Sequence, residues 1–426
     1  MTDISWIDAA LTSVRPQVVG ALMRYFRDLD TAEEAFQEAC LKALKTWPQK
    51  GPPRDPAAWL IFVGRNAAID DIRKRSRQQA LPGEEVLSDL DDAEPSMAER
   101  LDSADYRDDV LRLMFICCHP DLPATQQIAL ALRIVSGLTV AEIARAFLVS
   151  EAAMEQRITR AKRKVAAAGV AFETPSAADR VERIAAVAAM VYLLFNEGYS
   201  ASGGEAHIRE PLCDEAIRLG YLLLRLYPAE PELMGLVALM LFQHARLPAR
   251  LDGDGEIVLL EDQDRGLWRG KLIAEAGALI EKAARHRRPG SYQLQAAIAY
   301  EHAKAARAED TDWVAIDQYY RMLETLNPSP VITLNRAVAV SRHEGPEAAL
   351  KLIEPLAGPL SGYFHFHGVR GALLTQLGRS REARAAFEKA ISIANTPAEA
   401  AHIRRHLDRL QRETATIAGS SAANQV

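Results

Sequence analysis

The sequence predicts an all-α protein of several domains. Ala, Leu, Glu and Arg dominate the 426 residues, apolar side chains recur at spacings of three and four, and alternating runs of β-branched residues are scarce. A chain of this length exceeds what one hydrophobic core supports, so two to four domains are expected. The hydrophobic content of 49% and the charged content of 25% are those of an ordinary globular protein.

Charge and cysteine content narrow the class further. The formal net charge of −6 argues against a protein that coats nucleic acid nonspecifically, although a local basic face is compatible with it. Cys117 and Cys118 are adjacent, which is poor geometry for a structural disulfide and favours a reducing compartment. The first residues lack the features of a signal peptide, and no window approaches eighteen uninterrupted apolar residues. We therefore expect a cytoplasmic protein that does not associate with a membrane.

Breaks in composition predict five segments. A first helical domain covers 10–80, with a loop at "KGPPRDP" (50–56). A flexible acidic linker follows at 81–109, because Glu84 to Asp109 holds eleven acidic residues and only two arginines. A second helical domain is predicted at 110–168. An irregular helical extension follows "ETPSAAD" at 176–289, and a helical array follows "HRRPGS" at 290–415.

The second domain contains a predicted helix-turn-helix at 138–165. Thr139 and Ser150 are placed as N-caps of its two helices. From Ser150 onward an apolar stripe recurs at helical spacing, comprising Met154, Ile158, Ala161 and Val165. The opposite face carries Glu155, Gln156, Thr159, Arg160 and Arg163. A basic, amide-bearing face suits the DNA major groove, and the alternative is a solvated amphipathic helix within a bundle.

Two further helices carry opposite charge. "PAAWLIFVGRNAAIDDIRKRSRQ" (56–78) combines aromatic and amide side chains with a basic end, which suits single-stranded nucleic acid because unpaired bases stack on rings. "DLDTAEEAFQEACLKALKTW" (28–47) is predicted to bury Ala35, Phe36, Cys40, Leu41 and Leu44. Its exposed acidic side is then expected to comprise Glu33, Glu34 and Glu38. The basic helix and the acidic helix therefore indicate two different binding partners for this domain. The alternative is that each charged face is simply solvated.

These motifs, in this order over residues 10–168, resemble a bacterial sigma-70 family sigma factor of the extracytoplasmic-function (ECF) type. The resemblance implies that region 2 docks on the β′ clamp helices of core RNA polymerase through Asp30, Glu33, Glu34, Gln37 and Glu38. It implies that the −10 promoter element is melted and captured by Trp59, Arg65, Asn66, Asp70, Arg73 and Lys74, with Arg75 and Arg77 in the same basic cluster.

The same resemblance makes the helix-turn-helix region 4, whose polymerase partner is the β flap. Region 4 would read the −35 element through Glu155, Gln156, Thr159, Arg160 and Arg163, with Arg157 and Lys162 nearer the DNA backbone. Glu155 departs from the family, which often has a basic or neutral residue there. An unusual −35 preference, or a hydrogen bond accepted from cytosine, would follow.

The C-terminal array shows an internal period of 34 residues. Small residues recur at Ala303, Ala337 and Gly371 and again at Ala315, Ala349 and Ala383, while bulky ones recur at Tyr319, Ile353 and Phe387. Small residues where helices cross and a bulky one beside them are marks of tetratricopeptide (TPR) repeats, so we expect three TPR-like units and a surface for a protein partner. The layout resembles the ECF group that carries a long C-terminal extension.

Several short motifs do not predict chemistry. "LDGDGEIVLLED" has its glycine in the wrong place for a calcium loop, and "GLWRGK" lacks the residues of a phosphate loop. The thiols of "ICCHP" cannot complete a tetrahedral metal shell alone, so packed thiols are expected. "FHFHG" is expected to serve packing inside a repeat helix. We find no catalytic site, and we expect no metal and no cofactor.

The sequence thus predicts an ECF-type sigma factor without a catalytic step, acting with core RNA polymerase on promoter DNA. The alternative is a TPR-containing helix-turn-helix regulator that binds duplex operators without joining polymerase. The aromatic and basic segment at 56–78 favours the sigma factor, because a plain activator needs no platform for single-stranded DNA.

Overall fold

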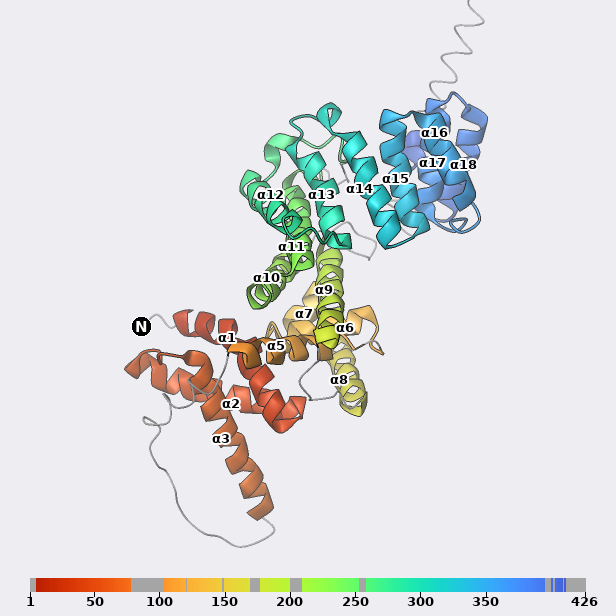
Figure 1. Cartoon of the computed structure of the whole chain (residues 1–426). Helices are drawn as coiled ribbons and strands as arrows, with labels where there is room; N and C mark the ends of the chain where they lie inside the picture. Colours follow the sequence, from red (N-terminus) through yellow and green to blue (C-terminus); the bar gives the residue numbers. More distant parts are fainter. Residues whose placement is uncertain are drawn as a thin grey trace, which may run out of the picture. The chain divides into compact units, whose positions relative to one another are not determined.

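The computed structural model describes residues 5–77, 103–119, 121–147, 149–168, 177–199, 209–252, 258–394, 400, 403–408 and 410. Within these ranges regular structure is helical, apart from an isolated bridge residue at Leu251, so the predicted all-α class is confirmed (Figure 1). In the same ranges no helix is both long and apolar enough to cross a membrane. The chain divides into two compact units, residues 1–194 and 195–426.

The first unit begins with three helices, α1 (Ser5–Phe26), α2 (Leu29–Lys50) and α3 (Pro56–Arg77). Asp28 caps α2, because its Oδ1 accepts a hydrogen bond from the Thr31 amide at 2.8 Å. Trp6 stacks on the buried Trp47, with ring centroids 6.3 Å apart. Helix α1 therefore begins before residue 10, from which the first domain is predicted. A Cβ at Gly64 would lie 2.8 Å from the Ala35 carbonyl oxygen, so glycine lets α3 approach α2 closely.

The rest of the first unit contains α5 (Ser103–Cys117), α6 (Ala124–Ile134), α7 (Val140–Ala146), α8 (Glu151–Ala168) and α9 (Ala177–Tyr199), of which α9 is included as far as Leu194. Helix α5 starts at Ser103, within the last residues of the segment predicted as an acidic linker. Asp109 is only 2% exposed and accepts a hydrogen bond from Arg112 at 3.1 Å. Pairing with arginine permits this carboxylate to be buried. The acidic residues around Asp109 in the sequence had indicated an exposed position instead. Residues 81–102 of the predicted linker lie outside the described ranges.

Helices α7 and α8 form the predicted helix-turn-helix. Thr139 and Glu142 make a capping box, in which the Glu142 amide donates to Thr139 Oγ1 at 3.2 Å and the Thr139 amide donates to Glu142 at 2.7 Å. Ser150 Oγ accepts from the Ala153 amide at 3.3 Å at the start of α8. The predicted apolar stripe of α8 is buried in full, at Met154, Ile158, Ala161 and Val165. Both predicted caps and the predicted buried face are thus confirmed.

The second unit is an array of helices, and short 3-10 turns occur in some of the connections. Its first helices after α9 are α10 (Glu210–Leu226), α11 (Pro231–Ala245) and α12 (Gly270–Ala284), with η1 (Leu247–Ala249) and η2 (Arg265–Leu267) between the last two. Helix α11 is buried along most of its length, as its nearly continuous apolar sequence requires. Pro231 occupies the first turn of α11, where its missing amide hydrogen costs no hydrogen bond within the helix.

Three helix pairs follow. They are α13 (Ser291–Lys304) with α14 (Trp313–Leu326), α15 (Pro330–His343) with α16 (Pro346–Ile353), and α17 (Phe364–Gln376) with α18 (Ser380–Ser392), together with η3 (Ala308–Asp310) and η4 (Glu354–Leu356). Both helices of the third pair begin 34 residues after their counterparts in the second, which matches the sequence period. The expected core positions of these two pairs are buried, namely Ala337, Ala349, Ile353, Ala383 and Phe387. In the first pair, Ala303, Ala315 and Tyr319 are only half-buried.

Candidate promoter and polymerase interface

Helix α2 exposes a continuous mixed surface. Its exposed residues include the acidic and amide side chains Asp30, Glu34, Gln37 and Glu38. Leu41 and Leu44 are also exposed, at 51% and 45%, so their predicted place on the buried side is wrong. Alanines at positions 32, 39 and 43 fill the buried face instead, because small side chains let helices pack closely. The sequence spacing does indicate that Leu41 is exposed, because Leu41 lies on the same helix face as Glu34 and Glu38.

Glu33 does not belong to this exposed surface. It is only 5% exposed, which corrects its predicted place on the acidic outer side of the helix. Its Oε1 accepts a hydrogen bond from Arg15 at 3.1 Å, and its Oε2 accepts one from Lys162 at 2.6 Å. A carboxylate paired in this way can be buried without remaining unsatisfied. Sequence reasoning did not single out Arg15, and no local motif marks it.

Helix α3 carries the residues predicted for the −10 element. Trp59 is half-buried, and its ring packs edge-on against Trp47 with centroids 5.5 Å apart. The guanidinium carbon of Arg65 lies 4.4 Å from the centre of the Tyr25 ring, and Asn66 is exposed. The other predicted residues lie on the last turns of α3, beyond the side chains that the structure describes, and are Asp70, Arg73, Lys74, Arg75 and Arg77.

Helix α8 presents the residues predicted for the −35 element. Opposite its buried stripe, it exposes five polar side chains, which are Glu155, Gln156, Thr159, Arg160 and Arg163. Arg157 is half-buried. Lys162 turns towards α2, where its Nζ lies 2.7 Å from Asp30 Oδ1 and 2.6 Å from Glu33 Oε2. Burial lowers the pKa of Lys162, but the hydrogen bonds to Asp30 and Glu33 outweigh it and raise the pKa overall.

The vicinal cysteines at the end of α5 are packed, as predicted. Cys117 and Cys118 are buried free thiols, and Cys118 Sγ donates to the Met114 carbonyl oxygen at 3.1 Å. Burial raises the pKa of both thiols well above the ordinary value, so they stay protonated. They therefore act as small apolar side chains in the core of this domain.

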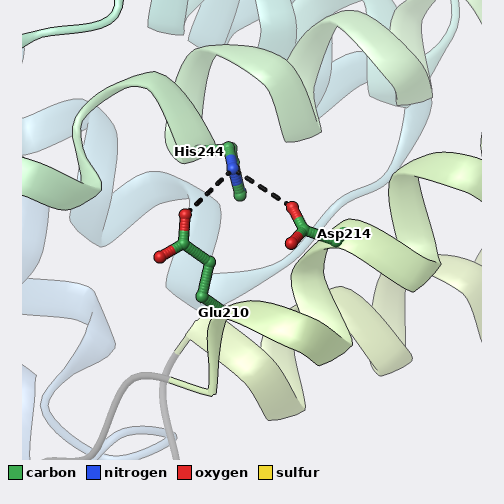
Figure 2. Close-up of side chains that lie close together, drawn as sticks. All are labelled: Glu210, Asp214 and His244. Carbon is green, nitrogen blue, oxygen red and sulfur yellow. Dashed lines mark ion pairs between the residues drawn. The ribbon is translucent and has the colours of Figure 1, made fainter.

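A polar cluster in the second unit brings together Glu210 and Asp214 of α10 and His244 of α11 (Figure 2). Their ligand atoms lie within 4.8 Å of one another, a grouping that could hold a metal ion. Arg269 donates to Glu210 Oε1 at 2.7 Å and lies 2.7 Å from His244 Nε2. Burial lowers the pKa of His244. A neutral imidazole can accept a hydrogen bond from the guanidinium, and Arg269 offsets the charge of the Glu210 carboxylate, with which it forms an ion pair at 2.7 Å.

A helix-turn-helix with a polar, partly basic outer helix, beside a three-helix domain with an acidic surface, defines a helical DNA-binding protein. Residues 11–78 match the family described as sigma-70 region 2, and residues 112–165 match the family described as sigma-70, region 4. Residues 183–284 match a family of unknown function, DUF6596.

Two relatives extend these matches. The uncharacterized protein R00370 of Rhizobium meliloti (strain 1021) is 68% identical over 418 residues, which cover 98% of this chain and 99% of that protein. The ECF RNA polymerase sigma factor BldN of Streptomyces coelicolor (strain ATCC BAA-471 / A3(2) / M145) is 34% identical over 142 residues, 32% of this chain and 50% of that protein. The chain therefore carries sigma-70 region 2 and region 4 domains followed by a C-terminal extension, an arrangement that is consistent with a sigma factor of the ECF type.

Proposed function

We propose that this sigma factor binds core RNA polymerase through the exposed surface of α2 and directs initiation at its own promoters. The acidic and apolar stripe from Asp30 to Leu44 supports this proposal. It offers negative charge and exposed apolar surface to a basic partner helix. By resemblance, that partner is the β′ clamp helices, and region 4 meets the β flap.

The observation that carries the proposal is the outward face of α8. It combines Gln156, Arg160 and Arg163 with a fully buried opposite stripe on the second helix of a helix-turn-helix. Arginine pairs with guanine and glutamine with adenine in the major groove, so this face suits the −35 element. The basic end of α3 is assigned to the −10 element, and half-buried Trp59 and exposed Asn66 lie earlier on the same helix.

The extension is proposed to modulate this activity and to recruit a protein partner. Support comes from its last two helix pairs, whose helices begin 34 residues apart, the interval of TPR-like arrays. Helix α9 belongs to the first unit as far as Leu194, so the extension begins inside the unit that also contains region 4. We expect removal of the extension to reduce activity.

Run-off transcription tests the proposal. Purified chain added to core RNA polymerase should produce transcripts from a promoter set on which core polymerase alone produces none. A chain that binds duplex DNA without polymerase, fails to co-purify with core polymerase and yields no transcript would contradict the proposal. That outcome would instead identify the operator-binding regulator.

A further inference from the structure

Three side chains of metal-binding type converge where helices α10 and α11 pack together in the second unit. Glu210 and Asp214 lie one turn apart at the start of α10, so both carboxylates are on one face of that helix. His244 is one residue before the end of α11, and its imidazole ring faces both carboxylates (Figure 2). The sequence pattern contains only the pair of acids, which is why no metal is expected from it, because the histidine comes from the next helix.

The spacing of the three ligand atoms suits a transition-metal ion. Nitrogen and oxygen ligands about 2.0–2.2 Å from a tetrahedral Zn²⁺ lie about 3.3–3.6 Å from one another. His244 Nε2 lies 3.4 Å from Asp214 Oδ1 and 3.6 Å from Glu210 Oε1, and the three atoms all lie within 4.8 Å of one another. The two carboxylates are 44% and 64% exposed, so small rotations can bring all three atoms onto one ion.

Arg269 balances only part of this cluster. Its guanidinium lies 2.7 Å from His244 Nε2 and donates to Glu210 Oε1 at 2.7 Å. Because a guanidinium has only donors, Nε2 is the ring nitrogen without a proton. The lone pair of Nε2 then also faces Asp214 Oδ1, a second acceptor, with no proton between them. Among the described residues no lysine or arginine pairs with Asp214, so one negative charge stays unbalanced.

We infer that Glu210, Asp214 and His244 form a binding site for a divalent transition-metal ion of the Zn²⁺ class, which replaces the guanidinium of Arg269. One dication offsets both carboxylates and takes the lone pair of Nε2, so the contact between two acceptors disappears. The Arg269 side chain is 36% exposed and can turn into solvent, while its backbone amide still donates to the Ala245 carbonyl oxygen at 3.0 Å. Three protein ligands leave a fourth position open to water.

A second grouping of the same residue types is already saturated. Asp317, His343 and Glu344 also lie close enough to share an ion. Asp317 is buried, however, and it accepts hydrogen bonds from Arg336 at 2.7 Å and from Arg321 at 3.0 Å. Two guanidinium groups balance this carboxylate, so the grouping is an ion-pair network between α14 and α15. It therefore supplies a control within the same chain.

The test measures Zn²⁺ bound to the full chain, purified without a polyhistidine tag. Equilibrium dialysis should show a bound ion that Mg²⁺ does not displace, because magnesium prefers oxygen ligands to imidazole. Asp214→Asn, at an exposed side chain, should weaken Zn²⁺ binding about ten-fold or more. Arg269→Ala should strengthen it about five-fold or more, because the competing cation is gone. Glu344→Gln removes a carboxylate from the saturated grouping and should leave the affinity unchanged.

Co²⁺ in place of Zn²⁺ identifies the kind of ligand. Its spectrum should lack the intense near-ultraviolet band of a thiolate ligand, because the neighbouring Cys213 Sγ contacts the Phe195 carbonyl oxygen instead. Circular dichroism checks that each variant is folded, and none of these measurements depends on transcription. The site is overturned if Asp214→Asn binds Zn²⁺ as tightly as Glu344→Gln, if Arg269→Ala binds it no more tightly than the wild type, or if a thiolate band appears.

Discussion

Gly371 on α17 faces the ring of Phe387 on α18 so closely that a Cβ would lie 2.5 Å from a ring carbon. The contact joins the small and bulky positions of the last predicted repeat. Gly371→Ala should therefore lower the free energy of unfolding of the second unit by about 1–3 kcal/mol, because the buried ring must shift. Chemical denaturation of the full chain measures the loss. Gly362→Ala, with nothing within 4 Å, is the control and should stay within about 0.5 kcal/mol of wild type.

The outer face of α8 predicts a sequence-specific loss. The Arg160 side chain is exposed, whereas the Arg157 side chain is half-buried. Arg160→Ala should cost about 1–3 kcal/mol of discrimination at one −35 position, while Arg157→Ala should weaken binding to all sequences about equally. Competition binding of holoenzyme to a set of −35 variants separates the two. Equal losses on every sequence for Arg160→Ala would remove it from the base-reading set.

The basic end of α3 predicts a defect in opening DNA. Arg73→Ala with Lys74→Ala should bind core polymerase as the wild type does, since neither residue lies on α2. The double variant should fail to melt the promoter, because phosphates of the separated strand lose their counter-charges. Permanganate footprinting of unpaired thymines reports melting directly. Full melting by this variant would show that the −10 assignment is wrong.

Helix α9 predicts how truncation acts. Its residues to Leu194 belong to the first unit, and the Arg183 guanidinium carbon lies 5.1 Å from the centre of the Phe115 ring on α5. A chain ending at Gly169 should lose activity and melt at lower temperature, because that contact disappears. A chain ending at Ser200 keeps α9 and should recover most of the lost thermal stability. Higher transcription from either truncated chain would make the extension an inhibitor.

His302 predicts how stability depends on pH. Burial lowers its pKa from 6.5 to about 4, and the charges of Arg246 and Arg265 act in the same direction. Between these values the unfolded chain binds a proton that the folded chain does not, so the free energy of unfolding falls as the pH falls from 6.5 to 4. His302→Gln should flatten this fall relative to its own value at pH 8, as measured by denaturant titration. An unaltered slope would contradict the assignment.

Local chemistry predicted much of the fold. The Thr139 capping box and the α8 stripe depend on residues within a few positions of one another, so sequence spacing determines them. The same reasoning misplaced Leu41 and Glu33, because side-chain polarity was taken as the guide to burial. Whether a carboxylate is buried depends on its partners, and Lys162 is 129 residues from Glu33 in sequence. No local pattern encodes such a contact.

The vicinal thiols of Cys117 and Cys118, at the end of α5, can report how often the region 4 core opens. Because both are buried and protonated, an alkylating reagent reaches them only when the region 4 core opens. The rate at which Cys117 and Cys118 are alkylated in the native protein, followed by mass spectrometry, therefore measures how often that core opens. No residue has to be introduced, and polymerase or DNA can be present during the reaction. A slower alkylation on assembly would show how much each partner stabilises the region 4 core against opening.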